Sequence, residues 1–137
     1  MTPEQVNKSC RVLIVEDTEE RQKILTDLYR AHAWGLVNTG RRAITLISAF
    51  EFDIISLDYN LRGEFTGADV AQHIAKSRNQ HARIIIHSMN PQGATRIAEI
   101  LPNAAQFPVN KMASSNQIFK RLRSQIDALG ATFDWVL

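Results

Sequence analysis

The stretch FDIISLDYN, Phe52 to Asn60, sets an apolar run directly before a carboxylate. The run FDIISL has the length and the β-branched content of a strand. Apolarity that is nearly continuous, with no alternation, is typical of strands covered on both faces, as in parallel sheets. The stretch therefore predicts a buried strand that ends at Asp58, with Tyr59 and Asn60 in the loop that follows.

Similar runs lie on both sides of this stretch. RVLIV (Arg11 to Val15) and ARIIIH (Ala82 to His87) indicate two more strands, and LVNT (Leu36 to Thr39) and AQFPVN (Ala105 to Asn110) are weaker candidates. Segments with helical spacing follow each strand, the first after Thr18 as a candidate N-cap. Five alternating strand and helix signals predict a three-layer, doubly wound α/β domain, because right-handed crossovers place helices on both faces of a parallel sheet.

Composition limits the kind of protein this is. A chain of 137 residues suits one domain with one continuous core, and a net charge of +2 gives no support to nucleic-acid binding. Cys10 is the only cysteine, so the chain has neither an internal disulfide nor a cysteine metal site. The start of the sequence is polar and no 18 apolar residues run together. We expect a cytoplasmic domain with no nucleic-acid or membrane partner.

The residues that end the predicted strands carry the chemistry. Ligands of open α/β sheets bind beyond the carboxyl ends of the strands. Crowded carboxylates repel one another unless a cation lies among them, and Mg²⁺ or Mn²⁺ suits oxygen ligands. A lysine and a hydroxyl at the same edge suit a phosphoryl group. The candidates are Glu16 and Asp17 after the first strand, Asp58 after the third, Ser88 after the fourth and Lys111 after the fifth.

The segments LIVEDTEERQ, DIISLDYNL, IIIHS and PVNK, in this order, resemble the receiver domain of bacterial response regulators. The resemblance runs from about Arg11 to Gly130 and implies a single domain, 1–137, with a flavodoxin-like (βα)5 fold: a five-stranded parallel sheet with helices on both faces. It implies phosphoryl transfer to Asp58, a carboxylate nucleophile, with Mg²⁺ or Mn²⁺ as cofactor. By this resemblance the metal ligands are Glu16, Asp17, Asp58 and the carbonyl of Asn60, and the phosphoryl contacts are Ser88 and Lys111.

A second resemblance concerns HSMNPQGA, His87 to Ala94, which is similar to a motif of the cyclic-phosphate processing receiver domains. Those domains are proposed to act on phosphate esters and not to relay a phosphoryl group. Along an extended segment Ser88 and Asn90 point to one side and His87 to the other. Asn90 would then contact a bound phosphate, and His87 is a further candidate for such a contact.

Three functions follow from these features. Phosphoryl acceptance at Asp58 ranks first, with an upstream histidine kinase or phosphotransfer protein and a downstream protein as partners. A phosphoesterase acting on cyclic or other phosphate esters is the alternative, so enzyme activity is left open. The third is a degenerate receiver that only binds proteins. The intact carboxylates and Lys111 argue against it, and departures from the usual receiver pattern at Arg62, Met89 and Pro108 keep it open.

Each candidate residue also has a purely structural interpretation. Glu16 and Asp17 suit the first turn of a helix, whose dipole favours negative charge. Ser88 and Asn90 suit a loop, His87 a hydrogen-bonded core position and Lys111 a solvated one. We further expect Trp135 and Val136, after a helix that ends near Gly130, to form an exposed apolar tail.

Overall fold

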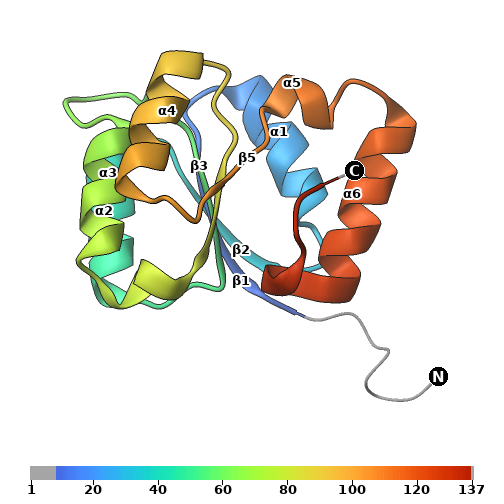
Figure 1. The fold of residues 1–137 in the computed structure, drawn as a ribbon, viewed down its shortest axis with the longest axis horizontal. Coiled ribbons are helices and arrows are strands. Elements are labelled where there is room, and N and C mark those ends of the chain that lie inside the picture. Colours follow the sequence, from blue (N-terminus) through green and yellow to red (C-terminus); the bar gives the residue numbers. More distant parts are fainter. Residues whose placement is uncertain (1–8, 137) are drawn as a thin grey trace.

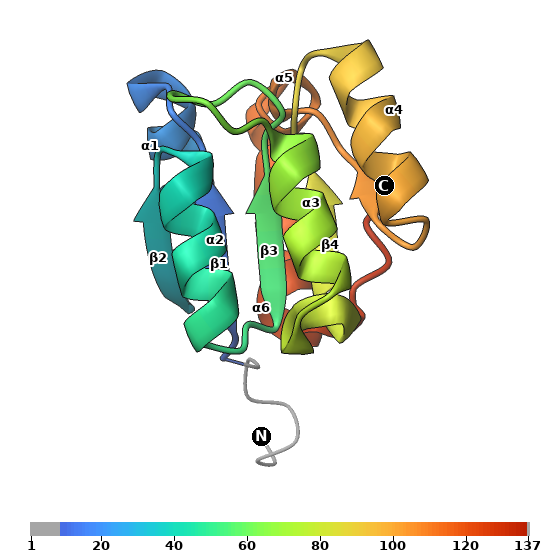
Figure 2. The same cartoon turned by 90° about the vertical axis from the view of Figure 1, so that its left-hand side faces the viewer.

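The computed structural model describes residues 9–136, in which five parallel strands form one sheet of order β2-β1-β3-β4-β5. All five strands run in the same direction, so their carboxyl ends meet at one edge (Figure 2). The predicted flavodoxin-like (βα)5 fold is confirmed. The strands are β1 (Arg11–Val15), β2 (Ala33–Val37), β3 (Ile54–Leu57), β4 (Arg83–Ile86) and β5 (Ala105–Gln106).

Helices cover both faces of the sheet. Figure 1 shows α2, α3 and α4 on one side, and α1, α5 and α6 on the other. Among the described residues the helices are α1 (Glu19–Leu28), α2 (Gly40–Ala49), α3 (Gly67–Ala75), α4 (Pro91–Ile100), α5 (Val109–Met112) and α6 (Asn116–Leu129), with the 3₁₀ turns η2 (Arg78–His81) and η3 (Gly130–Thr132). None of these helices is both long and apolar enough to cross a bilayer.

The alternation of side chains along each strand divides the core into two halves. Ile14 of β1, Ile54 of β3 and Ile85 of β4 pack towards α1 and α6. Their neighbours in sequence, such as Leu13 and Ile55, pack towards α2, α3 and α4. Because both faces bury apolar side chains, the strands need the near-continuous apolarity from which the sequence predicts them.

Side-chain caps fix where most of the helices begin. Thr39, Thr66, Asn90 and Ser115 each precede a helix and accept a hydrogen bond from a backbone N–H in its first turn. Thr18 occupies the same position before α1, as predicted, but its side chain makes no such bond. Its hydroxyl is used in the site described below.

The fifth strand is shorter than predicted and ends at Gln106. Pro108 lacks the N–H needed for a strand ladder, and residues 109–112 form the short helix α5, which the sequence analysis does not predict. Hydrogen bonds from Phe107 to Ile86 and from Val109 to His87 still hold this segment beside β4. Lys111 therefore lies in a helical turn and does not end a strand.

The exposed tail predicted at the end of the chain is wrong for Trp135. Trp135 is only 4% exposed, whereas Val136 is 67% exposed. The Trp135 ring lies 5.7 Å from the Phe107 ring and 5.6 Å from the Phe133 ring, measured between centroids. The segment after α6 thus closes the core on the α1 and α6 face, an arrangement that depends on folding back and not on local pattern.

We expect Trp135→Ala to lower the free energy of unfolding by roughly 3 kcal/mol or more, because it leaves a large cavity among aromatic rings. Val136→Ala, at the adjacent exposed position, should change it by less than about 0.5 kcal/mol. Urea denaturation of both variants measures the difference. Equal stabilities would show that the end of the chain does not pack on the core.

Candidate functional site

Strand register brings three polar side chains into one row. Val15, Leu57 and Ile86 are paired across β1, β3 and β4, and each is the last residue of its strand. The residues that follow them are Glu16, Asp58 and His87, so these three lie side by side at the carboxyl edge. Their ligand atoms all lie within 4.8 Å of one another, and all three residues are buried.

A chain of hydrogen bonds holds His87 in this row. Its Nδ1 lies 2.8 Å from the Ser56 hydroxyl and its Nε2 lies 2.9 Å from Glu16 Oε1. Because an ionised carboxylate only accepts hydrogen bonds, the Nε2 proton is donated to Glu16, and in the neutral ring Nδ1 accepts from Ser56. His87 thus points into the carboxylate cluster. The alternation of side chains gave this direction, but only the register shows that Glu16 lies there.

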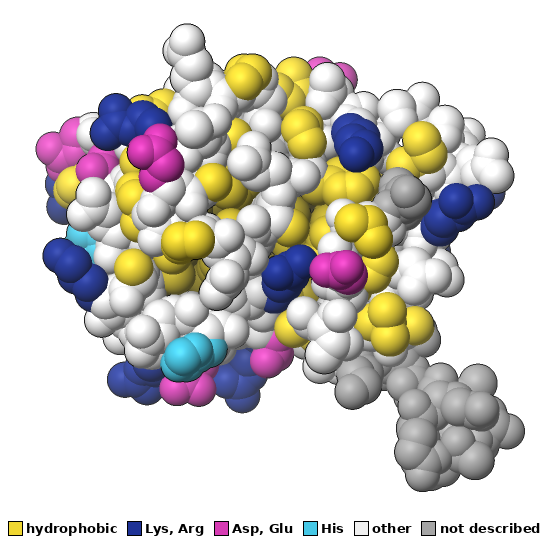
Figure 3. Space-filling model, viewed as in Figure 1, with side chains coloured by type: hydrophobic (Ala, Val, Ile, Leu, Met, Phe, Trp, Pro, Cys, Tyr) yellow, Lys and Arg dark blue, Asp and Glu magenta, His cyan; other side chains and the backbone are white. Residues whose placement is uncertain are grey.

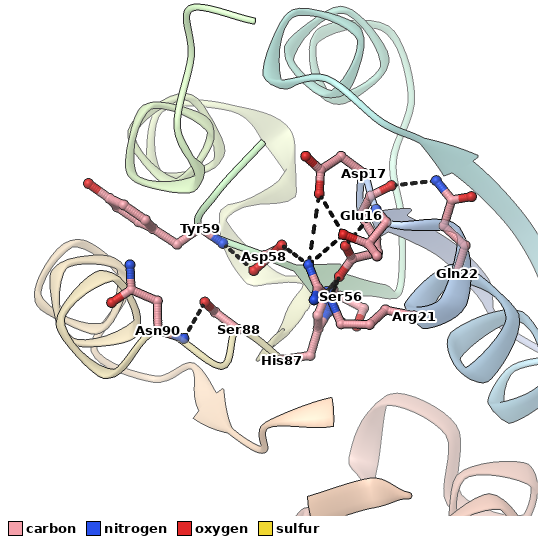
Figure 4. Close-up of polar contacts among 11 residues, drawn as sticks. Glu16, Asp17, Arg21, Gln22, Ser56, Asp58, Tyr59, His87, Ser88 and Asn90 are labelled. Carbon is pink, nitrogen blue, oxygen red and sulfur yellow. Dashed lines mark hydrogen bonds and ion pairs between the residues drawn. The ribbon is translucent and has the colours of Figure 1, made fainter. Parts of the chain in front are cut away.

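Arg21 is the cation of the cluster, and it is not among the residues predicted from the sequence. Its Nε donates to Glu16 Oε1 at 3.1 Å, and its Nη2 lies 3.6 Å from Asp58 Oδ2 and 3.9 Å from Asp17 Oδ1 (Figure 4). Arg21 is four residues after Asp17, at the start of α1. This spacing places the two side chains on the same side of a helix start and is the signal that could have revealed the contact.

The two oxygens of Asp58 have different surroundings. Oδ1 accepts a hydrogen bond from the backbone N–H of Tyr59 at 2.8 Å. Oδ2 is buried and has no hydrogen-bond partner among residues 9–136, where its one ion-pair partner is the more distant guanidinium of Arg21. Burial, followed by the negative charge of Glu16, raises the pKa of Asp58 above its ordinary value. Oδ2 is therefore the atom of the site best placed to take a ligand.

Both carboxylate oxygens of Glu16, unlike those of Asp58, have hydrogen-bond partners. Burial alone would raise the pKa of Glu16, but hydrogen bonds from His87 and Arg21 outweigh burial and lower this pKa to about 2. The backbone N–H of Thr18 adds a third hydrogen bond, to Oε2, at 3.0 Å. Glu16 is thus held as an anion inside the protein.

Asp17 and Asn60, two of the predicted metal ligands, lie further out. The Asp17 side chain is partly exposed and its Oδ1 accepts a hydrogen bond from the Thr18 hydroxyl at 3.3 Å. Asn60 is exposed in the loop after β3. Both lie close in sequence to the buried carboxylates, and their roles as metal ligands stay predictions.

The polar residues of HSMNPQG mainly build the start of α4. The Ser88 hydroxyl accepts from the backbone N–H of Asn90 at 3.1 Å, and Asn90 Oδ1 accepts from the N–H of Gly93 at 3.1 Å. Pro91 follows in the first turn, where its missing N–H costs nothing. Asn90 is therefore an N-cap, and only its amide nitrogen is free for the predicted phosphate contact.

Gly93 of this motif makes room for Tyr59. A Cβ at Gly93 would lie 2.3 Å from Cγ of the Tyr59 ring, and one at Gly67 would lie 2.0 Å from the carbonyl oxygen of Asp58. The half-buried Tyr59, next to Asp58, thus lies between the first turns of α3 and α4, each of which requires a glycine.

Lys111, predicted to contact the phosphoryl group, is exposed, and its Nζ lies 4.8 Å from the centroid of the Phe107 ring. Within residues 9–136 it forms no ion pair with a carboxylate of the site. Arg21 holds the position next to Asp58 that the sequence assigns to this lysine. Contact between Lys111 and a phosphate stays a prediction.

A basic hollow of about 310 Å³ lies at the same edge of the sheet. The loop after β3 forms one wall: Arg62 pairs with Thr39 in a β-bridge, and Phe65 packs against Gly40. Arg41 forms an ion pair with Glu64. Arg42 and Arg62 also line the hollow, and neither forms an ion pair within the described part of the chain. By contrast, the face in Figure 3 mixes scattered basic and acidic side chains.

Comparison with protein families gives one match, to the family described as "Cyclic-phosphate processing Receiver domain", over residues 11–103. This span includes β1 to β4, the carboxylates, His87 and the motif that follows it. The chain belongs to the cyclic-phosphate processing receiver domain family. The resemblance found in HSMNPQGA is thereby confirmed for most of this receiver domain.

Solved structures of response-regulator receivers share the fold. The phosphorylated cyanobacterial phytochrome response regulator RcpA has a TM-score of 0.70 at 17% identity, over 91% of this chain and 97% of its own. The receiver domain of the sensor histidine kinase PA1611 from Pseudomonas aeruginosa, with magnesium coordinated in its active-site cleft, has a TM-score of 0.64 at 22% identity, over 85% and 99% of the two chains.

A third solved structure, the response regulator TrrA from Thermotoga maritima in complex with Mg²⁺ and BeF, has a TM-score of 0.61 at 20% identity, over 82% and 97% of the two chains. Curated proteins give no match. At these identities the structural matches establish the receiver fold and leave the chemistry to the residues of this chain.

The residues present fit a divalent cation. Asp58 Oδ2 is buried without a hydrogen bond, Glu16 is held ionised beside it, and Asp17 is within reach of the same arginine. Carboxylate oxygens are the ligands that Mg²⁺ and Mn²⁺ prefer. His87 Nε2 is engaged with Glu16, so the histidine supports a ligand more readily than it serves as one.

Without metal, Asp58→Asn should stabilise this receiver domain at pH 7. The folded state raises the pKa of Asp58, so ionising the carboxyl costs stability at every pH above the pKa in the unfolded chain. Asparagine does not ionise, so the variant does not lose this stability. Urea midpoints in chelator should therefore be higher for the variant at pH 7 and converge below about pH 3, where the carboxyl is protonated in both states. A lower midpoint at pH 7 would contradict clustering of the carboxylates.

Gly93→Ala should destabilise the domain by about 1–3 kcal/mol, although alanine is normally the better helix residue. The reason is the overlap between the new Cβ and the Tyr59 ring. In a Tyr59→Ala background the same substitution should be neutral or stabilising, which chemical denaturation of the four proteins measures. An equal loss in both backgrounds would rule out the ring contact as its cause.

Proposed function

We propose that this receiver domain opens a cyclic phosphate ester with the help of Mg²⁺ or Mn²⁺ bound beside Asp58. The buried Glu16–His87 pair next to the unpaired Oδ2 of Asp58 is the observation that supports this function best. A carboxylate that accepts a phosphoryl group is already deprotonated and needs no proton partner. Hydrolysis of an ester does, because water must lose a proton and the departing oxygen must gain one.

The reaction consumes one water molecule. The water oxygen forms a bond to phosphorus and loses a proton, one phosphorus–oxygen bond of the ring breaks, and the released oxygen takes up the proton that the water lost. The product is an open phosphate monoester with a free hydroxyl on the same molecule. A bound divalent cation would polarise a phosphate oxygen and favour loss of a proton from water.

The residues of the chain divide this work. Asp58 Oδ2 and the carboxylate of Glu16 would hold the cation, with Asp17 and the carbonyl of Asn60 at its outer side. His87 orients Glu16 through a hydrogen bond of 2.9 Å, and this pair would take the proton from the attacking water. Ser88, Lys111 and the free amide nitrogen of Asn90 would contact phosphate oxygens. Arg42 and Arg62 in the neighbouring hollow favour a substrate with further negative charge.

Phosphoryl acceptance at Asp58 is the second candidate. It is supported by the unpaired Oδ2 and by the receiver fold shared with response regulators. This function implies an upstream histidine kinase or phosphotransfer protein and a downstream protein partner. The sequence alone ranks it first, but the family match and the position of His87 reverse that order.

The two functions predict different results for the same variants. With Mg²⁺ and a 2′,3′-cyclic mononucleotide as the probe, we expect ring opening that phosphorus NMR follows directly. His87→Gln should reduce the rate by about 10² or more, the usual range for a lost proton-transfer group. Asp58→Ala should abolish turnover. Asn90→Ser keeps an N-cap but removes the amide nitrogen, so it separates capping from contact with phosphate.

Acetyl phosphate and intact-mass measurement provide the opposing test. A stable phosphoryl adduct that is lost in Asp58→Asn, without turnover of the cyclic probe, would replace the proposed function by phosphoryl relay. If the folded protein shows neither reaction with Mg²⁺ present, the third hypothesis, a receiver that only binds proteins, is the one that remains.

A further inference from the structure

The position between the carboxylates already holds a cation that belongs to the chain. The guanidinium of Arg21 donates to Glu16 at 3.1 Å and lies 3.6 Å from Asp58 and 3.9 Å from Asp17. Figure 4 shows the guanidinium among the three acidic side chains. Asp58 Oδ2 has no other cationic partner among residues 9–136.

Thr18 helps to keep Arg21 in this place. Its hydroxyl accepts a hydrogen bond from Arg21 Nη2 at 2.7 Å and donates one to Asp17 at 3.3 Å. As a result α1 has no side-chain cap, unlike α2, α3, α4 and α6. The residue that would stabilise the helix start is used to hold the arginine against the carboxylates.

We infer that Arg21 is an internal counter-ion that competes with the divalent cation and sets the affinity of the site for it. The inference rests on the metal site of the proposed function. A carboxylate binds a metal ion by directing an oxygen lone pair at it. In this site the guanidinium of Arg21 already donates to Glu16 Oε1 and faces Asp58 Oδ2, so the ion and the arginine compete for the same oxygens. A guanidinium and a divalent ion held by the same oxygens also repel each other.

Displacement of Arg21 gives the site a second positive group. Arg21 belongs to the first turn of α1, so its guanidinium remains tethered beside the carboxylates after it leaves them. The planar group suits the oxygens of a phosphate, which it can contact in pairs. Arg21 would then contact the phosphate in addition to Lys111, the lysine predicted from the sequence for this role. Binding of metal and phosphate is coupled through this one side chain.

The first test compares metal affinity by calorimetry in wild type, Arg21→Met and Arg21→Lys. Arg21→Met should bind Mg²⁺ at least about tenfold more tightly, because a competing charge is gone. In chelator the same variant should have a lower unfolding midpoint, because three carboxylates lose their counter-ion. Arg21→Lys keeps the charge and should remain close to wild type in both measurements.

Lys23→Met is the matched control. It removes one positive charge from the same helix, at a side chain that is 77% exposed and pairs only with Glu19 in the described structure. Its affinity for Mg²⁺ should equal that of wild type. A change as large as that of Arg21→Met would mean that net charge, and not competition at the site, is the cause.

The outcomes separate this inference from the proposed function. Circular dichroism first establishes that each variant is folded. If Asp58→Asn abolishes Mg²⁺ binding but Arg21→Met leaves it unchanged or weaker, competition is wrong and the metal site stands. If neither wild type nor Arg21→Met binds Mg²⁺ or Mn²⁺, the metal site itself is wrong.

Inorganic phosphate tests the second role of Arg21. In wild type, phosphate should tighten Mg²⁺ binding, because it takes up the guanidinium that the ion displaces. In Arg21→Met this gain should be much smaller. An equal gain in the two proteins would show that the displaced arginine is not a phosphate ligand.

Discussion

The site is governed by the repulsion between two carboxylates that the sheet brings together away from water. Glu16 is fully buried and Asp58 is 3% exposed, and register places them on adjacent strands. Negative charges in such surroundings require compensation, which here comes from His87, Arg21 and backbone N–H groups. Compensation is unequal: Glu16 is fully engaged, and one oxygen of Asp58 is left open to a ligand.

The fold could be predicted because its signals are local. Strands such as ARIIIH must be apolar on both sides, and this requirement appears directly in the sequence. The carboxyl-edge rule then placed Glu16 and Asp58 in one site. The helix α5 and the folding back of Trp135 depend on contacts with distant parts of the chain, so no local pattern signals them.

The difference between local signals and contacts with distant parts of the chain also explains which features of the site were not predicted. Alternation along β4 shows that His87 and Ser88 point to different sides, but only the pairing of Leu57 with Ile86 shows what His87 meets. The contact between Arg21 and Asp58 could be predicted only by knowing that the first turn of α1 lies beside the end of β3. The motif HSMNPQG thus contains two kinds of residue: an inward histidine that belongs to the site, and a serine, an asparagine and a proline that start a helix.

The position of Tyr59 between Asp58 and α4 makes its ring a spectroscopic probe of the site. Its N–H bonds Asp58 and its ring lies against the first turn of α4, so a ligand on Asp58 acts on the environment of this ring. The sequence contains only one other tyrosine, Tyr29, which is buried on the opposite face of the sheet beside Trp135. Fluorine-labelled tyrosine would therefore give two resonances, one reporting on the site and one serving as an internal reference for the core.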